Sequence, residues 1–232
     1  MSVRLSPILE PSRDTILVGD PRRAFALGQV LTVQPKMSHL ARGLWGYTGT
    51  TGAGKALTVQ STGVGGASAV AVIADLAEMG VRRIVRLGTC VSAGTGRDGH
   101  TASTDRPAEA GAAFLIRCAH PGDGASRSLT GTDQPVEPDP GLNEALAGVA
   151  TTAEVFSHDL PLRLDRTSTT PGTAVLRDLQ TAATFAVAKE LGLEAAAILV
   201  VAETGVGTAL SESVLEQLFE PLGRSVAAAL AG

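Results

Sequence analysis

The 232-residue sequence has few aromatic side chains, which make up 3% of it, and only three lysines beside 16 arginines. A ligand site built on stacked aromatic rings is therefore excluded, and a pocket for a planar ligand must be small or lined by aliphatic side chains. The net charge of −4 argues against general nucleic-acid binding, which requires a basic surface. Any anion site must be a local group of arginines.

The sequence also lacks the cysteines of a disulfide framework and the long apolar run of a membrane span. Its two cysteines, Cys90 and Cys118, show no metal-ligand spacing with histidine, so we expect buried thiols and no metal. No apolar stretch approaches the roughly 20 residues that cross a bilayer. The first 11 residues lack the basic-then-apolar layout of a signal peptide. These absences predict a cytoplasmic protein without membrane or nucleic-acid partners.

What the sequence does have is an alternation of short apolar runs and helical segments, with 44% hydrophobic and 18% charged residues. This pattern predicts one α/β domain over residues 1–232. The run 56–61, the glycine turn after it and the helix 67–79 lead into the run 83–87, which predicts parallel pairing of the two runs. The predicted strands are 15–18, 47–51, 56–61, 83–87, 111–119, 153–156 and 195–201; the predicted helices are 22–27, 67–79, 143–149, 176–191 and 211–230. Segments 94–111 and 121–140 are rich in polar and turn-forming residues and are predicted to be loops.

Glycine-bearing turns follow three of the predicted strands, at 19–23, 61–66 and 86–89. In open α/β sheets, ligands bind at the carboxyl ends of strands, and glycine lets backbone N–H groups approach an anion. Arg86 lies just before Gly88-Thr89, where an arginine is unusual for a purely structural reason. The arginine fork matches phosphate oxygens, so the combination predicts a phosphate site. Each turn alone is weak evidence, because tight turns and surface salt bridges also use these residues.

Taken in order, several segments resemble the family of purine nucleoside phosphorylases and uridine phosphorylases, in its branch with small hexameric subunits. The resemblance covers nearly the whole chain. It implies a phosphorylase-type fold, with a central twisted mixed sheet flanked by helices. The segments are Gly19-Asp20-Pro21-Arg22-Arg23-Ala24, Arg42-Gly43-Leu44-Trp45-Gly46-Tyr47-Thr48-Gly49, Ser61-Thr62-Gly63-Val64-Gly65-Gly66-Ala67-Ser68, Arg86-Leu87-Gly88-Thr89-Cys90, Asp178-Leu179-Gln180-Thr181-Ala182 and, as in uridine phosphorylases, Asp123-Gly124-Ala125-Ser126.

By this resemblance, Gly19, Arg23, Arg86 and Thr89 bind inorganic phosphate, and Arg42 reaches the same phosphate from a neighbouring subunit. The implied activity is phosphorolysis of a nucleoside to free base and pentose-1-phosphate, with phosphate as co-substrate and no cofactor. A bound phosphate is positioned for attack, and its charge stabilises an oxocarbenium-like sugar. Arg86 is therefore a candidate catalytic residue. The implied assembly is a homo-oligomer, a hexamer in the family, with Arg42 shared across a dimer interface.

The sugar half of the implied site departs from the family. Leu179 replaces a methionine beside the sugar, and Gln180 replaces a glutamate that accepts hydrogen bonds from both ribose hydroxyls. Gln180 still offers a carbonyl oxygen but has no charge, so restoring glutamate is expected to raise activity on common nucleosides. Arg4 aligns with a histidine over the 5′-hydroxyl, which raises the hypothesis of a 5′-anionic substrate. In the alternative, Arg4 lies in solvent or pairs with a subunit neighbour.

The base half also differs. The resemblance places Cys90, Val91 and Asp159 beside the base, but the aromatic residue and the glutamine–arginine pair that read uracil are absent. Glu203 falls where purine-cleaving members carry an acid that protonates the leaving base; the alternative is that it caps the following loop. His158 is interpreted as a surface residue.

The resulting hypothesis is a phosphorylase for a uridine-like or modified nucleoside. Two alternatives stay open: a homologue that binds nucleoside or phosphate without turnover, and a nucleosidase. The arginines at Arg23, Arg42 and Arg86 oppose the nucleosidase, because hydrolysis gives no reason to keep three cations around an anion.

Overall fold

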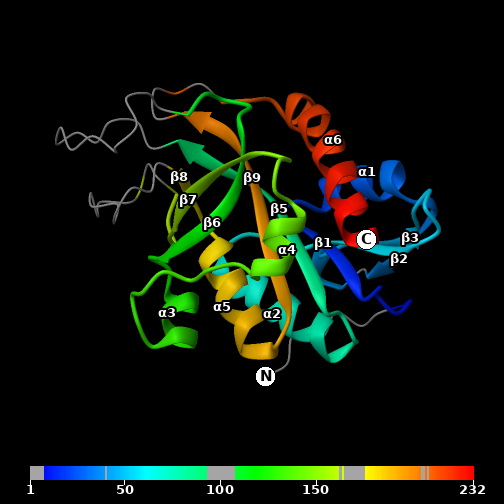
Figure 1. Ribbon diagram of the computed structural model, residues 1–232, viewed down its shortest axis with the longest axis horizontal. Helices are drawn as coiled ribbons and strands as arrows, with labels where there is room; N and C mark the ends of the chain where they lie inside the picture. Colours follow the sequence, from blue (N-terminus) through cyan, green and yellow to red (C-terminus); the bar gives the residue numbers. More distant parts are fainter. Residues whose placement is uncertain are drawn as a thin grey trace.

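The computed structural model describes residues 8–39, 41–92, 108–161, 164, 176–204, 207 and 209–232, which form nine strands and six α-helices (Figure 1). Arg4 lies outside these residues, as does most of the predicted loop 94–111. The strands are β1 (Asp14–Val18), β2 (Val33–His39), β3 (Gly46–Thr50), β4 (Ala56–Ser61), β5 (Arg83–Ser92), β6 (Ala113–Pro121), β7 (Thr151–Ser157), β8 (Leu176–Asp178) and β9 (Glu194–Thr204).

All nine strands belong to one mixed sheet with the order β2-β3-β4-β1-β5-β8-β7-β6-β9. Strands β4, β1, β5 and β9 are parallel to one another. A further pairing of β5 with β9 closes β5, β8, β7, β6 and β9 into a ring, and β1 to β4 extend it as an open sheet. The two long strands β5 and β9 both belong to the ring, and β5 connects it to the open sheet through its pairing with β1.

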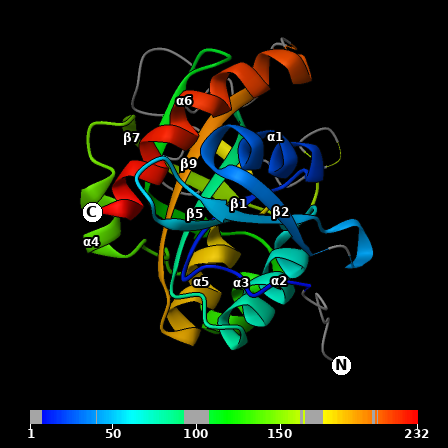
Figure 2. The same cartoon turned by 90° about the vertical axis from the view of Figure 1, so that its right-hand side faces the viewer.

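Helices cover both faces of this sheet (Figure 2). The helices are α1 (Pro21–Leu31), α2 (Gly66–Glu78), α3 (Gly124–Thr130), α4 (Pro140–Ala145), α5 (Thr181–Leu191) and α6 (Glu212–Ala231). Helices α2 and α5 pack on one face around a core that includes Ile73 and Phe185. Helices α1 and α6 pack on the other face around Leu27 and Phe219. The predicted fold class, a mixed sheet flanked by helices, is confirmed.

Local sequence explains where the main helices begin and end. Asp20 caps α1 by accepting a hydrogen bond from the Arg22 N–H, and Pro21 occupies the first turn, where its missing N–H costs nothing. Gly192 ends α5 in the left-handed conformation that favours glycine. None of the described helices is both long and apolar enough to cross a membrane.

The structure corrects several sequence predictions. The runs 56–61 and 83–87 are parallel, but they do not pair directly, because β1 lies between them. Segment 176–191 is not one helix: it starts as the short strand β8, and α5 begins at Thr181. The predicted loop 121–140 contains α3, and β2 was not predicted. The pairing error and the missed strand β8 both depend on strands that are distant in the sequence, which a local pattern does not reveal.

Candidate active site

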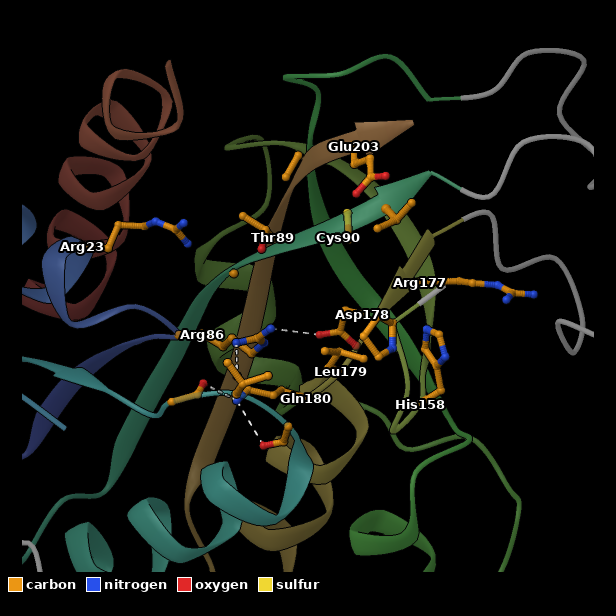
Figure 3. Close-up of a pocket in the computed structure, with 18 residues that line it drawn as sticks. Arg23, Arg86, Thr89, Cys90, His158, Arg177, Asp178, Leu179, Gln180 and Glu203 are labelled. Atoms are coloured by element: carbon orange, nitrogen blue, oxygen red, sulfur yellow. Dashed lines mark hydrogen bonds and ion pairs between the residues drawn. The ribbon is translucent and has the colours of Figure 1, made fainter. Parts of the chain in front are cut away.

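One cavity of about 490 Å³ opens where β1, β4, β5 and β9 reach their carboxyl ends (Figure 3). Its volume lies within the range typical of small-molecule pockets. Eighteen residues from both halves of the chain line it: Gly19, Arg23, Gly63, Val64, Gly65, Arg86, Gly88, Thr89, Cys90, Val91, His158, Pro161, Arg177, Asp178, Leu179, Gln180, Ala202 and Glu203. The three glycine-bearing turns predicted from the sequence therefore meet at one place.

Three helices also begin at this cavity. Gly19 comes two residues before α1, Gly65 immediately precedes α2, and Gln180 immediately precedes α5. The amino-terminal end of a helix carries partial positive charge and unpaired N–H groups. No side chain caps α2, whereas Asp178 and Ser157 accept hydrogen bonds from the N–H groups of Thr181 and Ala182 at the start of α5. The cavity is thus electrostatically suited to an anion.

Arg86 is the buried cation at the floor of the cavity, with 5% of its surface exposed. Its Nη2 lies 3.0 Å from Asp178 Oδ2, its Nη1 donates to Gln180 Oε1 at 2.7 Å, and its Nε donates to Thr181 Oγ1 at 3.2 Å. These bonds occupy three of the five N–H groups of the guanidinium. Asp178 and Gln180 therefore hold the cation in place and leave it the capacity to donate to an anion.

Gln180 uses both ends of its amide group within the protein. Its Nε2 donates to the backbone oxygens of Gly63 at 2.7 Å and Gly65 at 3.1 Å. Its Oε1 accepts from Arg86 and, at 3.2 Å, from Thr62 Oγ1. The side chain thus fastens the glycine turn before α2 to Arg86, as the dashed lines in Figure 3 show. Ribose binding by Gln180 stays a prediction, and it requires the sugar to displace one of these bonds.

Position 88 requires a glycine because the Arg86 side chain lies against its backbone. A Cβ atom at this position would lie 2.7 Å from Arg86 Cζ and Nη2 and 2.8 Å from Leu199 Cδ2. Such distances are too short for any real contact, so the guanidinium lies directly against a bare backbone. The glycine therefore determines where the arginine can lie.

Arg23 reaches the cavity from α1 and is also buried, with 7% of its surface exposed. Its Nη2 forms an ion pair at 3.1 Å with Glu212, whose side chain is 61% exposed, and its guanidinium lies over the Phe219 ring. The buried Nε atom has no hydrogen-bond partner among the described residues. A buried donor without a partner is costly, so this atom is suited to a ligand.

Glu203 enters the cavity because β9 carries an extra residue at this point. Cys90 aligns with Val201 and Val91 with Glu203, so Ala202 is left over as a bulge. A bulge redirects the side chains beside it. Burial raises the pKa of the Cys90 thiol, so this residue contributes a neutral wall. Glu203 is therefore the carboxylate that the cavity offers apart from Asp178, which is paired with Arg86.

The cavity gathers most of the predicted site residues but not all. Arg42 is exposed, has a positive φ of 60° and is absent from the cavity wall. Asp159 is also outside the wall, and its Oδ2 accepts a hydrogen bond from the Gly124 N–H at the start of α3. Its assignment to the base stays a prediction. The Arg4 hypothesis lies outside the described residues.

Sequence reasoning missed two basic side chains of the wall, His158 and Arg177. His158 is 6% exposed and stacks on Phe156, so its interpretation as a surface residue is wrong. The Arg177 guanidinium also lies over that ring, 6.0 Å from its centroid. Arg177 was hidden because its strand was predicted as part of a helix. His158 directly follows β7, and the rule that sites form at strand ends would have found it.

Comparison with known proteins points in the same direction as these motifs. No family model matches the chain. A purine nucleoside phosphorylase DeoD-type from Oceanobacillus iheyensis is 36% identical over 92 residues, which are 39% of each chain. Proteins of the same name from Caldanaerobacter subterraneus and Clostridium perfringens are 34% identical over 94 residues and 35% identical over 91 residues.

Over this part, the chain is similar to purine nucleoside phosphorylases and divergent from them. The aligned part spans only about two fifths of the length of these curated relatives. This similarity confirms the family resemblance that the sequence motifs indicated. The cavity wall includes the motif residues Gly19, Arg23, Arg86 and Thr89, and their role as phosphate ligands stays a prediction.

Proposed function

We propose that the protein is a nucleoside phosphorylase, which transfers a pentosyl group from a nucleoside to inorganic phosphate. The observation that carries this proposal is the placement of Arg23, Arg86, Gly19 and Thr89 around one cavity that also contains Glu203. The names of the matched relatives support the same reaction class.

In this reaction a phosphate oxygen attacks the anomeric carbon of the sugar while the glycosidic C–N bond breaks. The electron pair of that bond passes to the base, and Glu203, an exposed residue of the cavity wall, is the carboxyl group placed to pass a proton to the base nitrogen. The remaining N–H groups of Arg86 and the Nε of Arg23 hold the phosphate. Held in this way, the phosphate anion is close to the positive charge that develops on the sugar ring.

We infer that a purine is the first base to test and a uridine-like or modified base the second. Glu203 in the cavity supports a purine, because it matches the acid of purine-cleaving members. The uridine-like preference rested on Asp123-Gly124-Ala125-Ser126. Asp123 is fully buried, and its carboxylate caps α3 through the N–H and hydroxyl of Ser126. That segment therefore gives little support to uridine.

We propose further that the enzyme works in the cytoplasm as a homo-oligomer in which Arg42 completes the site of a neighbouring subunit. The exposure of Arg42 on its own subunit supports this arrangement. The family's hexamer is the expected assembly, built from dimers that share Arg42.

The decisive experiment combines the purified protein with inorganic phosphate and a panel of purine and pyrimidine nucleosides. Release of base together with pentose-1-phosphate, lost when phosphate is omitted, is the expected result. Release of free pentose without phosphate would identify a nucleosidase. Saturable binding of phosphate and nucleoside without release of base would identify a non-catalytic homologue.

A further inference from the structure

A second group of reactive side chains lies on the β6–β7 pair and belongs to no part of the cavity. Cys118 and His120 are two residues apart on β6, and Glu154 is on β7 in register with Cys118. The Sγ, imidazole nitrogen and carboxylate oxygen of these residues all lie within 4.8 Å of one another. The side chains of His120 and Glu154 are only 12% and 13% exposed.

The three groups converge on one point. His120 Nε2 lies 4.0 Å from Cys118 Sγ and 2.9 Å from Glu154 Oε2. In a cysteine–histidine–carboxylate catalytic triad, the thiol and the carboxylate would contact opposite ring nitrogens. Here both face the same nitrogen. This arrangement does not relay a proton to a nucleophile, but it suits ligands around a shared cation.

The spacing is close to that of a tetrahedral zinc site. Metal–ligand bonds of about 2.3 Å to sulfur and about 2.0 Å to nitrogen or oxygen place neighbouring ligand atoms about 3.3–3.6 Å apart. The observed 4.0 Å and 2.9 Å depart from these values by about half an ångström each. The Cys118 sulfur and the Glu154 carboxylate lie within 4.8 Å of each other, so they must turn toward one another by up to about an ångström to share an ion.

The surroundings of Glu154 also support a metal site. Arg117 Nη2 lies 2.5 Å from Glu154 Oε1, the oxygen that His120 does not contact. Metal-ligating carboxylates are commonly held in this way by an outer partner. A strand irregularity between Ile116 and Cys118 places Arg117 and the thiol where both can approach Glu154. The sequence predicted no metal site because it could not place Glu154 beside the two β6 residues.

We propose that Cys118, His120 and Glu154 bind one zinc ion, with water in the fourth position. The mixture of thiolate, imidazole and carboxylate favours zinc over magnesium or calcium, which prefer oxygen ligands alone. The ion would bind outside the cavity and join β6 to β7.

The test is a titration of the full-length, tag-free, chelator-treated protein with Co²⁺ in the presence of a phosphine reductant, followed by competition with Zn²⁺. We expect saturation at one cobalt per chain, with a thiolate-to-cobalt charge-transfer band that Zn²⁺ removes, and an unfolding midpoint raised by several degrees. Cys118→Ser should abolish the band, whereas the matched variant Cys90→Ser should keep it. Arg117→Ala should weaken binding about 10- to 100-fold.

Absence of a saturable band in the wild type, or a band that survives Cys118→Ser, would overturn the proposal. If Cys118→Ser fails to fold, X-ray absorption of the zinc-loaded wild type answers the same question. One sulfur neighbour at about 2.3 Å is expected there, and a shell of nitrogen and oxygen alone refutes the site.

Discussion

The substitution Gln180→Glu distinguishes between two predictions, because the structure and the family resemblance predict opposite effects on activity. By resemblance, Gln180→Glu restores the charge that binds ribose and raises activity. In the structure, the Gln180 amide donates to the carbonyl oxygens of Gly63 and Gly65. A carboxylate cannot donate, so an oxygen would face two carbonyl oxygens in a site that is only 3% exposed.

The size of the effect follows from these contacts. Each of the two lost hydrogen bonds contributes about 1 kcal/mol, and the facing carbonyl oxygens lose their donor. The new charge gains Arg86 as a partner, but Asp178 already neutralises that cation. We therefore expect Gln180→Glu to lower the free energy of unfolding by about 2–4 kcal/mol at pH 8 and to lower phosphorolysis.

A pH series makes this test specific. Burial beside Asp178 and two carbonyl oxygens favours the protonated form of the new glutamic acid, which can donate to Gly63. The pKa of this group is then higher in the folded than in the unfolded chain. Its stabilising contribution is present at low pH and is lost as pH rises through the folded pKa.

Denaturant unfolding of wild type and variant at pH 5 and pH 8 measures this difference. The deficit of Gln180→Glu should shrink at pH 5, whereas Gln180→Met, which has similar length and no charge, should show a deficit that does not change with pH. Unchanged stability at both pH values, together with higher activity on inosine or uridine, would refute the reasoning. Gln180 would then be free to turn toward the sugar.

Four further predictions follow from the site and the core. Arg86→Ala should reduce kcat/KM about 10²- to 10³-fold in a phosphorolysis assay while far-ultraviolet circular dichroism stays unchanged; full activity would remove the phosphate assignment. Gly88→Ala should lower the free energy of denaturant unfolding by about 1–3 kcal/mol and the activity at least tenfold, because its Cβ would collide with Arg86. The control Gly52→Ala, whose Cβ meets nothing within 4 Å, should leave both unchanged. Mixing Arg42→Ala chains with Arg86→Ala chains should restore part of the activity if sites are shared, and hybrid oligomers without activity would contradict sharing. Burial lowers the pKa of His39 to about 4, below its usual 6.5, so stability should fall as pH drops from 6.5 toward 4 in unfolding curves, and His39→Gln should flatten that dependence.

The sequence by itself determined the parts of this protein that depend on neighbouring residues. Apolar runs ending in glycine turns identified β1, β4 and β5 and the glycine-bearing segments that line the cavity. Local chemistry was sufficient here, because a strand followed by a glycine and a helix can bind an anion with its own backbone. The order of these segments also led to the family that the comparisons support.

Only the tertiary structure decided what depends on pairing between distant segments. The short strand β8 exists because Arg177 pairs with Val91, and no local signal interrupts the helical pattern around it. The hydrogen bonds of Gln180 to Gly63 and Gly65, more than 100 residues earlier, also could not be predicted from the sequence. Buried polar groups must find partners wherever the fold supplies them, and sequence spacing does not reveal which partners those are.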